Sequence, residues 1–590
     1  MGRSSSTPQI GTFTQSPFEG SLSKDDHGMA MTREPSPENT DGHQRPDTAV
    51  QVTEPMGSLY EVTRLRNIRS NQARVSRPGL ESSGQVEDFI ARGIIDEAEA
   101  EELYNTFHNS LNHYLWVGIE QIHTSLTSVR RSSQLLTATI LTVTALHIPT
   151  STKTFDNCYR EFLSLISSSM FSRYHSIDDV RALCIAAFWL SDVSWKLSGH
   201  AIRVATELDV HNAFFKALEG DREAFLRARL WYMLYVCDHH FSIAYGRPPM
   251  ISESLQIREH EQFLKLPFAD ALDYRILSQV ALFQIMTRIH DTFAEMRLPQ
   301  HDNVRAVLSL QHFPRMRHFN LEIDQWRVKW QSLQRHNNFI GTFPPKGIIL
   351  YSYFAKLQLN SFAIRGISTS QEDMATERKE FVDTAISAAM SILTFVLQEA
   401  DMRRALVGTP LYVHTMIAFA SVFLLNVATI KSQGAPLGRH FNIDAQLTWH
   451  NVEAMVKLLR SMVVSDRHLI QHVAAGLDTM LRKAKSVASG MPVPRGSSEE
   501  NCIASRQYDH SQADQSRQKS RQQEFWNDNR NDISRSMFVD PGIAGSSMEV
   551  GDNFVDDDHM MFMNETMLYD AFGTDTTNEV YNLLSNQFSC

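Results

Sequence analysis

The chain has 590 residues, of which 42% are hydrophobic and 21% are charged, and its formal net charge is -11 at pH 7. This composition supports a sizeable core in one large domain or in two to three ordinary ones. The five cysteines are widely spaced and form no CxxC or CxxxC pair, which excludes a disulfide scaffold and a structural zinc site of that spacing. The N-terminus lacks the apolar core of a signal peptide, so we expect an intracellular protein.

The first 84 residues fall into two parts. Residues 1–57 are rich in Ser, Thr, Pro and Gly and cannot bury enough apolar surface to offset the entropy of ordering, which predicts a disordered arm. Residues 58–84 form a basic segment. Its arginines are Arg64, Arg66, Arg69, Arg74 and Arg77. Guanidinium groups at this density fit a phosphate contact or a nuclear import signal, and equally a solvated or domain-docking segment, so both interpretations stay open.

Residues 85–485 carry a pattern that is almost wholly helical. Asp88–Trp116 repeats its apolar residues in steps of nearly four. Ser176 is placed as a hydroxyl N-cap, with Asp178 and Asp179 in the first turn of the helix that follows. Since no alternation of apolar and polar residues between hairpin turns stands out, the sequence predicts an all-α class with one large helical domain and disordered arms.

Further helices are expected at residues 197–208 and 226–241, the second of which ends before the Gly246–Pro249 breaker. Residues 411–430 are nearly long enough to span a bilayer. This stretch contains several polar side chains, and no second span is evident. We therefore interpret it as a buried central helix and expect no membrane partner.

Beyond residue 485 the composition changes twice. Residues 486–535 form a polar linker of mixed charge. Residues 536–590 contain seven Asp and three Glu with no Lys or Arg, so this segment carries a charge of -10 and the rest of the chain about -1. Acids interspersed with large apolar residues are typical of activation segments, whose apolar side chains dock in a coactivator groove. The docking residues are expected to be Phe554, Met560, Met561, Phe562, Met567, Leu568, Phe572, Leu583 and Leu584. A disordered or domain-covering acidic tail is the alternative.

Two blocks in the middle of the chain carry the most specific pattern: AFWLSDVSWKLSGHAIRVATELDVH and RARLWYMLYVCDHHFSIAYGRPPM. The residues that define it are Gly199, Ala201, Arg203, Ala205, Leu208, His211, Arg227, Arg229, Trp231, Tyr235, Asp238, Gly246, Arg247 and Pro248. In order and spacing they resemble the central (middle homology) domain of the fungal zinc binuclear cluster transcription regulators. Three positions depart from that pattern: Asp209 replaces a common glycine, Tyr232 a second tryptophan and His239 an arginine.

The resemblance implies a helical regulatory domain, linked in some family members to sensing of small molecules, in which most motif residues pack the core. It also implies a DNA-binding module with six zinc-holding cysteines. Here the first cysteine is Cys158, so that mode of DNA binding is excluded for this chain. Zinc is expected only if an upstream cysteine cluster was omitted, and no other cofactor is expected. DNA contact would come from such a cluster, from a zinc-cluster partner or from the arginine segment.

Signatures of catalysis are missing from the sequence: it has no GxGxxG, GxxxxGK[ST], GxSxG or HExxH pattern, so we predict no enzyme and no catalytic or metal-binding residue. The sequence predicts a regulator of a fungal gene set, acting in the nucleus as an activator with a transcription coactivator and, as open partners, a small-molecule effector and DNA. Two alternatives remain: an interaction protein that modulates a zinc-cluster factor without binding DNA, and, more distantly, an enzyme on a helical scaffold.

Overall fold

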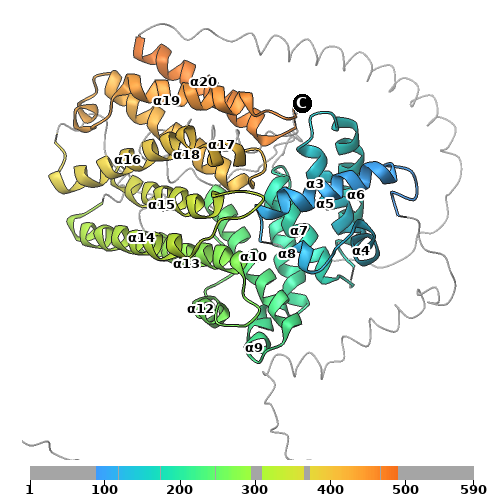
Figure 1. The fold of residues 1–590 in the computed structure, drawn as a ribbon. Helices are drawn as coiled ribbons and strands as arrows, with labels where there is room; N and C mark the ends of the chain where they lie inside the picture. The colour runs from blue at the N-terminus through green and yellow to red at the C-terminus, as the bar shows by residue number, and fades with distance from the viewer. Residues whose placement is uncertain are drawn as a thin grey trace, which may run out of the picture. The chain divides into compact units, whose positions relative to one another are not determined.

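The computed structural model describes residues 88–489, apart from 117, 173, 246–247, 294–307, 365–372 and 466. Its elements in this part of the chain are α-helices and 3-10 helices, with no strand, which confirms the predicted all-α class (Figure 1). The expected N-terminal arm, arginine segment, polar linker and acidic tail lie outside the described residues.

The first group of helices packs around α5 and α7, which contact each other. Helix α5 also contacts α3 and α6, and α7 contacts α8. The elements of this group are α3 (Glu97–Asn109), η1 (Leu111–His113), η2 (Ile119–Gln121), α4 (Leu126–Ser132), α5 (Gln134–Leu146), α6 (Thr152–Ser169), α7 (Ile177–Trp189), α8 (Ser194–Glu207), η3 (Val210–Asn212) and α9 (Ala213–Leu218).

The second group runs from green to orange in Figure 1, where successive long helices lie side by side. Its elements are α10 (Arg222–Tyr245), α11 (Leu255–Arg258), α12 (His260–Phe263), α13 (Ala271–Thr292), η5 (Leu310–His312), α14 (Phe313–Leu333), α15 (Phe343–Ser361), η6 (Phe362–Ile364), α16 (Thr376–Gln398), α17 (Ala400–Ala405), α18 (Leu411–Ser432), η7 (Pro436–His440), α19 (Ala445–Ser461) and α20 (Leu469–Ser489). Helix α10 joins the two groups, because it contacts α7, α8 and α9 as well as α13 and α18.

The helical pattern of Asp88–Trp116 is broken into a turn, α3 and η1. Gly93 has φ +72°, a left-handed conformation that suits glycine, and it closes the turn that precedes α3. Asp96 then caps α3, since its carboxylate accepts the Ala98 backbone N–H at 3.0 Å. Apolar spacing alone did not reveal this break, because the turn residues Phe89 and Ile90 are as buried as the helix face.

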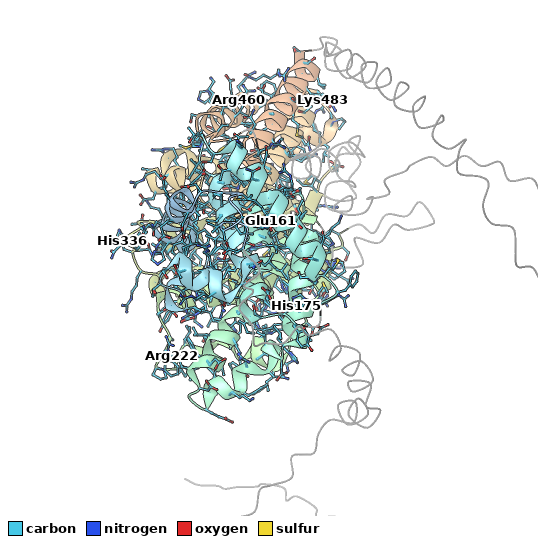
Figure 2. The ribbon with its side chains drawn as sticks, turned by 90° about the vertical axis from the view of Figure 1, so that its right-hand side faces the viewer. Glu161, His175, Arg222, His336, Arg460 and Lys483 are labelled. Atoms are coloured by element: carbon cyan, nitrogen blue, oxygen red, sulfur yellow. The ribbon has the colours of Figure 1, made fainter. Side chains whose placement is uncertain are left out.

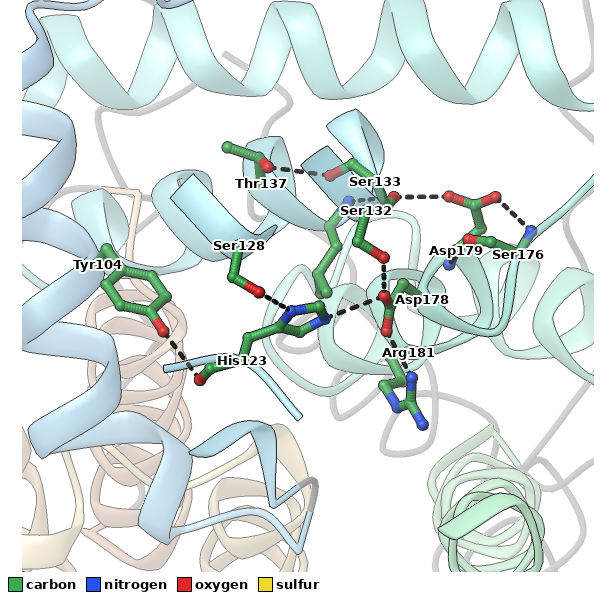
Figure 3. A network of polar contacts seen from close by, with 11 residues as sticks. Tyr104, His123, Ser128, Ser132, Ser133, Thr137, Ser176, Asp178, Asp179 and Arg181 are labelled. Atoms are coloured by element: carbon green, nitrogen blue, oxygen red, sulfur yellow. Dashed lines mark hydrogen bonds and ion pairs between the residues drawn. The ribbon is translucent and has the colours of Figure 1, made fainter. Parts of the chain in front are cut away.

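Helix α7 begins as the sequence predicted. The Ser176 hydroxyl accepts the Asp179 backbone N–H at 3.1 Å, and the Asp179 carboxylate accepts the Ser176 N–H at 2.8 Å, which completes a capping box. Asp178, in the same turn, is buried and belongs to a larger polar network (Figure 3).

Helix α18 is the core of the second group. Helices α16 and α18 are both long and apolar enough to cross a membrane by length and composition, so the expectation that no second stretch of this kind exists was wrong. In the fold, however, 89% of the most apolar window of α18 is buried, against 50% for α16. Two of its polar residues are accommodated within the helix, since Thr415 and Ser421 donate to the carbonyls of Leu411 and Ile417, and His414 bonds to the Leu406 carbonyl that precedes the helix. The structure thus agrees with the interpretation of this stretch as a buried central helix.

Charged side chains lie on the outside of this arrangement. Figure 2 shows Arg222, Arg460 and Lys483 at the edge of the packed side chains, and all three are exposed. Few charged residues of the described part are buried; Arg229 and Asp238 lie on α10 and Asp273 and Arg275 on α13, while Asp178, Arg181 and Arg378 lie on α7 and α16.

Candidate functional site

Helix α8 and the turn that follows carry the first sequence block. Ala201 is fully buried, whereas Gly199 is half-buried and a Cβ added there would make only an ordinary contact of 3.4 Å with the Met250 sulfur, so close packing is shown at Ala201 alone. Arg203 is exposed, and Leu208 is half-buried at the end of the helix. None of these residues converges on a common polar centre; they place α8 against its neighbours.

Asp209 occupies the position where the resembled family commonly has glycine. Its φ of +59° makes it the sole non-glycine residue with positive φ among those the structure describes. Aspartate tolerates this left-handed conformation better than most residues because its short side chain can bond locally. Here the carboxylate accepts a hydrogen bond of 2.7 Å from the Asn212 amide. The departure at this position therefore preserves the turn.

Arg229 on α10 forms the most extensive polar contact of the second block. Its Nε and Nη2 donate to the two carboxylate oxygens of Asp273, both at 2.6 Å, and its Nη1 donates to Gln121 Oε1 at 2.7 Å. A further ion pair to Asp270 spans 3.3 Å. Burial lowers the pKa of Arg229, but its bonds to Asp273 outweigh that effect and the net shift is upward, so the side chain stays cationic. Arg229 thereby joins α10 to the start of α13 and to η2.

The two aromatic motif residues, Trp231 and Tyr235, are both buried, and they contact different rings. Trp231 packs on His211 with ring centroids 5.8 Å apart, whereas Tyr235 lies 3.9 Å from the ring of His239. Arg227, on the exposed side of the same helix, pairs with Glu223 one turn earlier. The structure thus assigns packing contacts to these motif residues.

Asp238 anchors the segment that follows α10. Its Oδ2 accepts the backbone N–H groups of Met250 and Ile251 at 2.6 and 2.7 Å. Burial raises the pKa of Asp238 to about 6, and these two hydrogen bonds oppose the rise. Pro248 is exposed, while Gly246 and Arg247 lie outside the described residues. The aspartate therefore fixes the chain just beyond the breaker.

Next to this anchor is a cavity of about 180 Å³. It lies between the end of α10, the segment at Pro248 and Pro249, and helices α13 and α15. Its walls are mainly apolar. The buried polar residues of its described lining are His239, Ser242 and Gln358.

A second, smaller cavity of about 20 Å³ lies on the other side of α10, at His240. His240 stacks on Tyr412 with ring centroids 3.8 Å apart, and its Nε2 bonds to Gln279 Oε1 at 3.1 Å. Arg275 lines the same cavity and donates to the carbonyls of His113 and Tyr114, which end η1. This cavity has room for about one water molecule, and the Arg275 guanidinium caps the end of η1. Both observations indicate that the residues around this cavity have a structural role.

The sequence analysis missed a buried chain of side chains in the first group of helices (Figure 3). His123 bonds through Nδ1 to the Ser128 hydroxyl at 2.8 Å and through Nε2 to Asp178 at 3.0 Å. This order of serine, histidine and aspartate is the one that nucleophilic catalysis uses. Arg181 also pairs with Asp178, and Ser132 donates to it. Neither cavity at α10 reaches these residues, so the chain's evident effect is to tie α4 and α7 together.

Asp178 is ionised in this network. Burial raises its pKa, but the hydrogen bond from His123, the charge of Arg181 and the Ser132 hydroxyl outweigh burial and hold the pKa well below its usual value. The sequence offered no signal for this contact, because His123 and Asp178 are 55 residues apart and follow no shared motif.

Cysteines and metal-binding side chains do not gather into a site in the described part of the chain. Cys158, Cys184 and Cys237 are free thiols buried in the core. Among residues 88–489, with the gaps given above, no group of three or more His, Cys, Asp or Glu is placed to hold a metal ion. The expected arginine segment (64–77) and activation residues (554–584) fall outside the described residues.

We expect the Arg229→Ala variant to lose about 3–5 kcal/mol of unfolding free energy, because it leaves the fully buried carboxylate of Asp273 without a counter-charge. The matched control is Arg227→Ala on the same helix, whose partner Glu223 is exposed and whose loss should cost less than about 1 kcal/mol. Denaturant unfolding measures both. Equal losses of unfolding free energy in the two variants would show that the buried Arg229–Asp273 pair stabilises the fold no more than the exposed Arg227–Glu223 pair does.

A second prediction concerns pH. The folded protein holds a proton on Asp238 up to about pH 6, above the usual value of 3.8 for the unfolded chain. The favourable contribution of this proton is therefore complete below about pH 4 and is lost as the pH rises to about 6. Relative to Asp238→Asn, whose amide oxygen can still accept both N–H groups, the wild type should lose unfolding free energy over this interval.

Denaturant titrations at several pH values measure that difference. Asp238→Ala serves as the control, because it loses both hydrogen bonds at every pH and should be destabilised throughout by about 1–3 kcal/mol. A wild-type-to-Asn difference that stays constant over the interval would show that Asp238 has an ordinary pKa.

Comparison with known proteins agrees with the sequence blocks. Residues 93–484 match the family model described as the middle domain of the transcriptional activator of proteases prtT. A curated relative, the transcriptional activator of proteases prtT of Emericella nidulans, is 43% identical over 508 residues, which cover 84% of this chain and 74% of the relative. No solved structure matches. The resemblance to fungal regulators is thereby confirmed, and the chain belongs to the family of fungal transcriptional activators that contain the prtT-like middle domain.

Proposed function

We propose that this protein acts in the nucleus as a non-enzymatic activator of genes that encode proteases. The observation that carries the proposal is the 43% identity to an activator of proteases, which extends over 84% of the chain and includes the helices described above. In this scheme the helical body presents surfaces to partners and to an effector, and the acidic segment 536–590 recruits a coactivator.

The contacts of the motif residues support a role as a scaffold. Arg229 and Asp238, the buried charged residues of the motif, are engaged with Asp273 and with two backbone N–H groups. A side chain held in this way positions helices and is not available to a substrate. The serine, histidine and aspartate chain around His123 lies away from both α10 cavities, which favours a structural role there as well.

DNA contact in this proposal comes from a zinc-cluster partner, from an upstream zinc cluster or from the arginine segment at 64–77. Five guanidinium groups within fourteen residues would contact phosphates with little sequence preference, because phosphate contacts position a protein without reading bases. A partner or cluster would then supply the specificity. The alternative of an interaction protein that restrains a zinc-cluster factor predicts the opposite sign of regulation.

Fusing residues 536–590 to a heterologous DNA-binding domain should activate a reporter gene. The matched control carries Met567, Leu568 and Phe572 changed to alanine, which removes apolar docking groups and leaves all ten acids in place. We expect this control to lose most of the activation, about tenfold or more, since apolar anchors dominate binding of such segments. A wild-type fusion that does not activate the reporter would contradict the proposal that residues 536–590 recruit a coactivator.

Deleting the gene in its fungal host should lower protease transcripts several-fold, measured by RNA quantification, and should lower the protease activity of cell extract and culture medium together. Reintroducing the full chain should restore both, and a chain without residues 536–590 should restore neither. Higher protease transcripts after deletion would favour the restraining interaction protein, and unchanged transcripts would assign the protein to other genes.

A further inference from the structure

The cavity beside the sequence motif is apolar on most of its surface. Six side chains from α10, α13, α15 and η6 supply its apolar walls: Ile243, Phe283, Met286, Ile289, Leu359 and Phe362. Its volume of about 180 Å³ is close to that of apolar cavities of about 150 Å³ that accept a benzene-sized molecule. The cavity therefore has the size and the lining for a compound of one or two rings.

His239 supplies a hydrogen-bond acceptor in this wall. Its ring is only 4% exposed, and its Nδ1 lies 2.8 Å from the Tyr235 carbonyl. A carbonyl can only accept, so Nδ1 carries the proton. Burial lowers the pKa of His239 to about 4, which keeps the ring neutral and leaves a lone pair on Nε2. No described residue bonds to that nitrogen.

Gln358 supplies a second polar group from the opposite helix, α15. It is 6% exposed and lines the same cavity, and its side-chain amide makes no hydrogen bond with a described residue. Buried amides are nearly always hydrogen-bonded, because an unmet donor or acceptor away from water is unfavourable. Two polar side chains that have a hydrogen-bonding group without a partner among the described residues thus line one mainly apolar cavity.

The charges around the cavity restrict what can enter. Among its described lining residues, Asp291 is the carboxylate, and it is exposed, so solvent and salt screen its field. No lysine or arginine lines the described wall. An anionic ligand would give up its hydration without meeting a lysine or arginine of the described wall, and a cationic one would meet a carboxylate only at the solvent-screened Asp291.

We propose that this cavity binds an uncharged, mainly apolar ring compound that bears one N–H or O–H group. The donor hydrogen-bonds to His239 Nε2, the Gln358 amide contacts a polar atom of the same ligand, and the ring packs between Phe283, Met286 and Leu359. The bound compound would link α10 to α13 and α15. Its regulatory role rests on the proposed function, whereas binding itself does not.

Indole is a suitable probe, because it combines a two-ring apolar body with one N–H donor. Benzothiophene has a similar shape and lacks the donor. Isothermal titration and thermal unfolding of the full chain with each compound measure binding. We expect saturable binding of indole with a rise in the unfolding temperature, and binding of benzothiophene about tenfold weaker, as the loss of one buried hydrogen bond implies.

His239→Phe removes the acceptor and retains a ring, and it should weaken indole about tenfold without changing the affinity for benzothiophene. The matched control is His260→Phe. His260 is also a buried histidine whose Nδ1 bonds to a backbone carbonyl, that of Ile257, but it lies outside the cavity. Indole should bind this variant as it binds the wild type. Equal indole affinity in the His239 and His260 variants, or no saturable binding to the wild type, would overturn the proposal.

Ala355→Met provides a second test should His239→Phe fail to fold. Ala355 is buried in the same wall, and a methionine there would fill part of the cavity while leaving His239 and Gln358 unchanged, so indole binding should be lost. Retained binding would place indole elsewhere. If indole binds as expected while gene deletion leaves protease transcripts unchanged, the proposed function fails and the binding site stands. If indole does not bind while gene deletion lowers protease transcripts, the binding site fails and the proposed function stands.

Discussion

The structure depends on the burial of helix α10 beyond its first turns. Every residue from Ala228 to Ser242 is buried, so this part of the helix has no face on which polar groups can meet water. A buried charge or unmet hydrogen bond is costly, and each polar side chain of α10 must therefore find a partner on a neighbouring element. Arg229 donates hydrogen bonds to Asp273 and Gln121. Asp238 accepts one from the backbone N–H of Met250, just beyond the Gly246–Pro249 breaker, and His240 bonds to Gln279. These contacts fix α13, η2 and the Met250 segment around one helix.

His239 is one of several α10 residues for which this requirement is met only in part; the Trp231 indole N–H and His240 Nδ1 are likewise buried without a hydrogen-bond partner among the described residues. One ring nitrogen of His239 bonds to the Tyr235 carbonyl, and the other lines an apolar cavity. The same position commonly holds an arginine in the family that the sequence resembles. A guanidinium would bring a charge to this wall, whereas the neutral imidazole leaves space and a lone pair. Helix α10, which contacts both groups of helices, thus also carries His239, the residue proposed to bind a ligand.

Helices and their ends were predictable wherever a local rule applied. Ser176 and Asp179 form the expected capping box, and the helix predicted at 226–241 extends from Arg222 to Tyr245. The turn and cap at Gly93 and Asp96 were missed, since buried residues on both sides continue the apolar spacing. The His123–Asp178 contact and the meeting of His239 with Gln358 were also missed, because their partners lie far apart in the chain and follow no periodic pattern.

The sequence by itself determined the helical class, the motif that identifies the family and the separation of an acidic end from a nearly neutral remainder. These properties depend on periodicity, spacing and composition, which can be read along a single chain. The burial of Cys158, Cys184 and Cys237 was also expected from their apolar, helix-like surroundings in the sequence. The tertiary structure alone decided which charged residues are paired and where a cavity remains. Those outcomes depend on how helices that are distant in the sequence pack against one another.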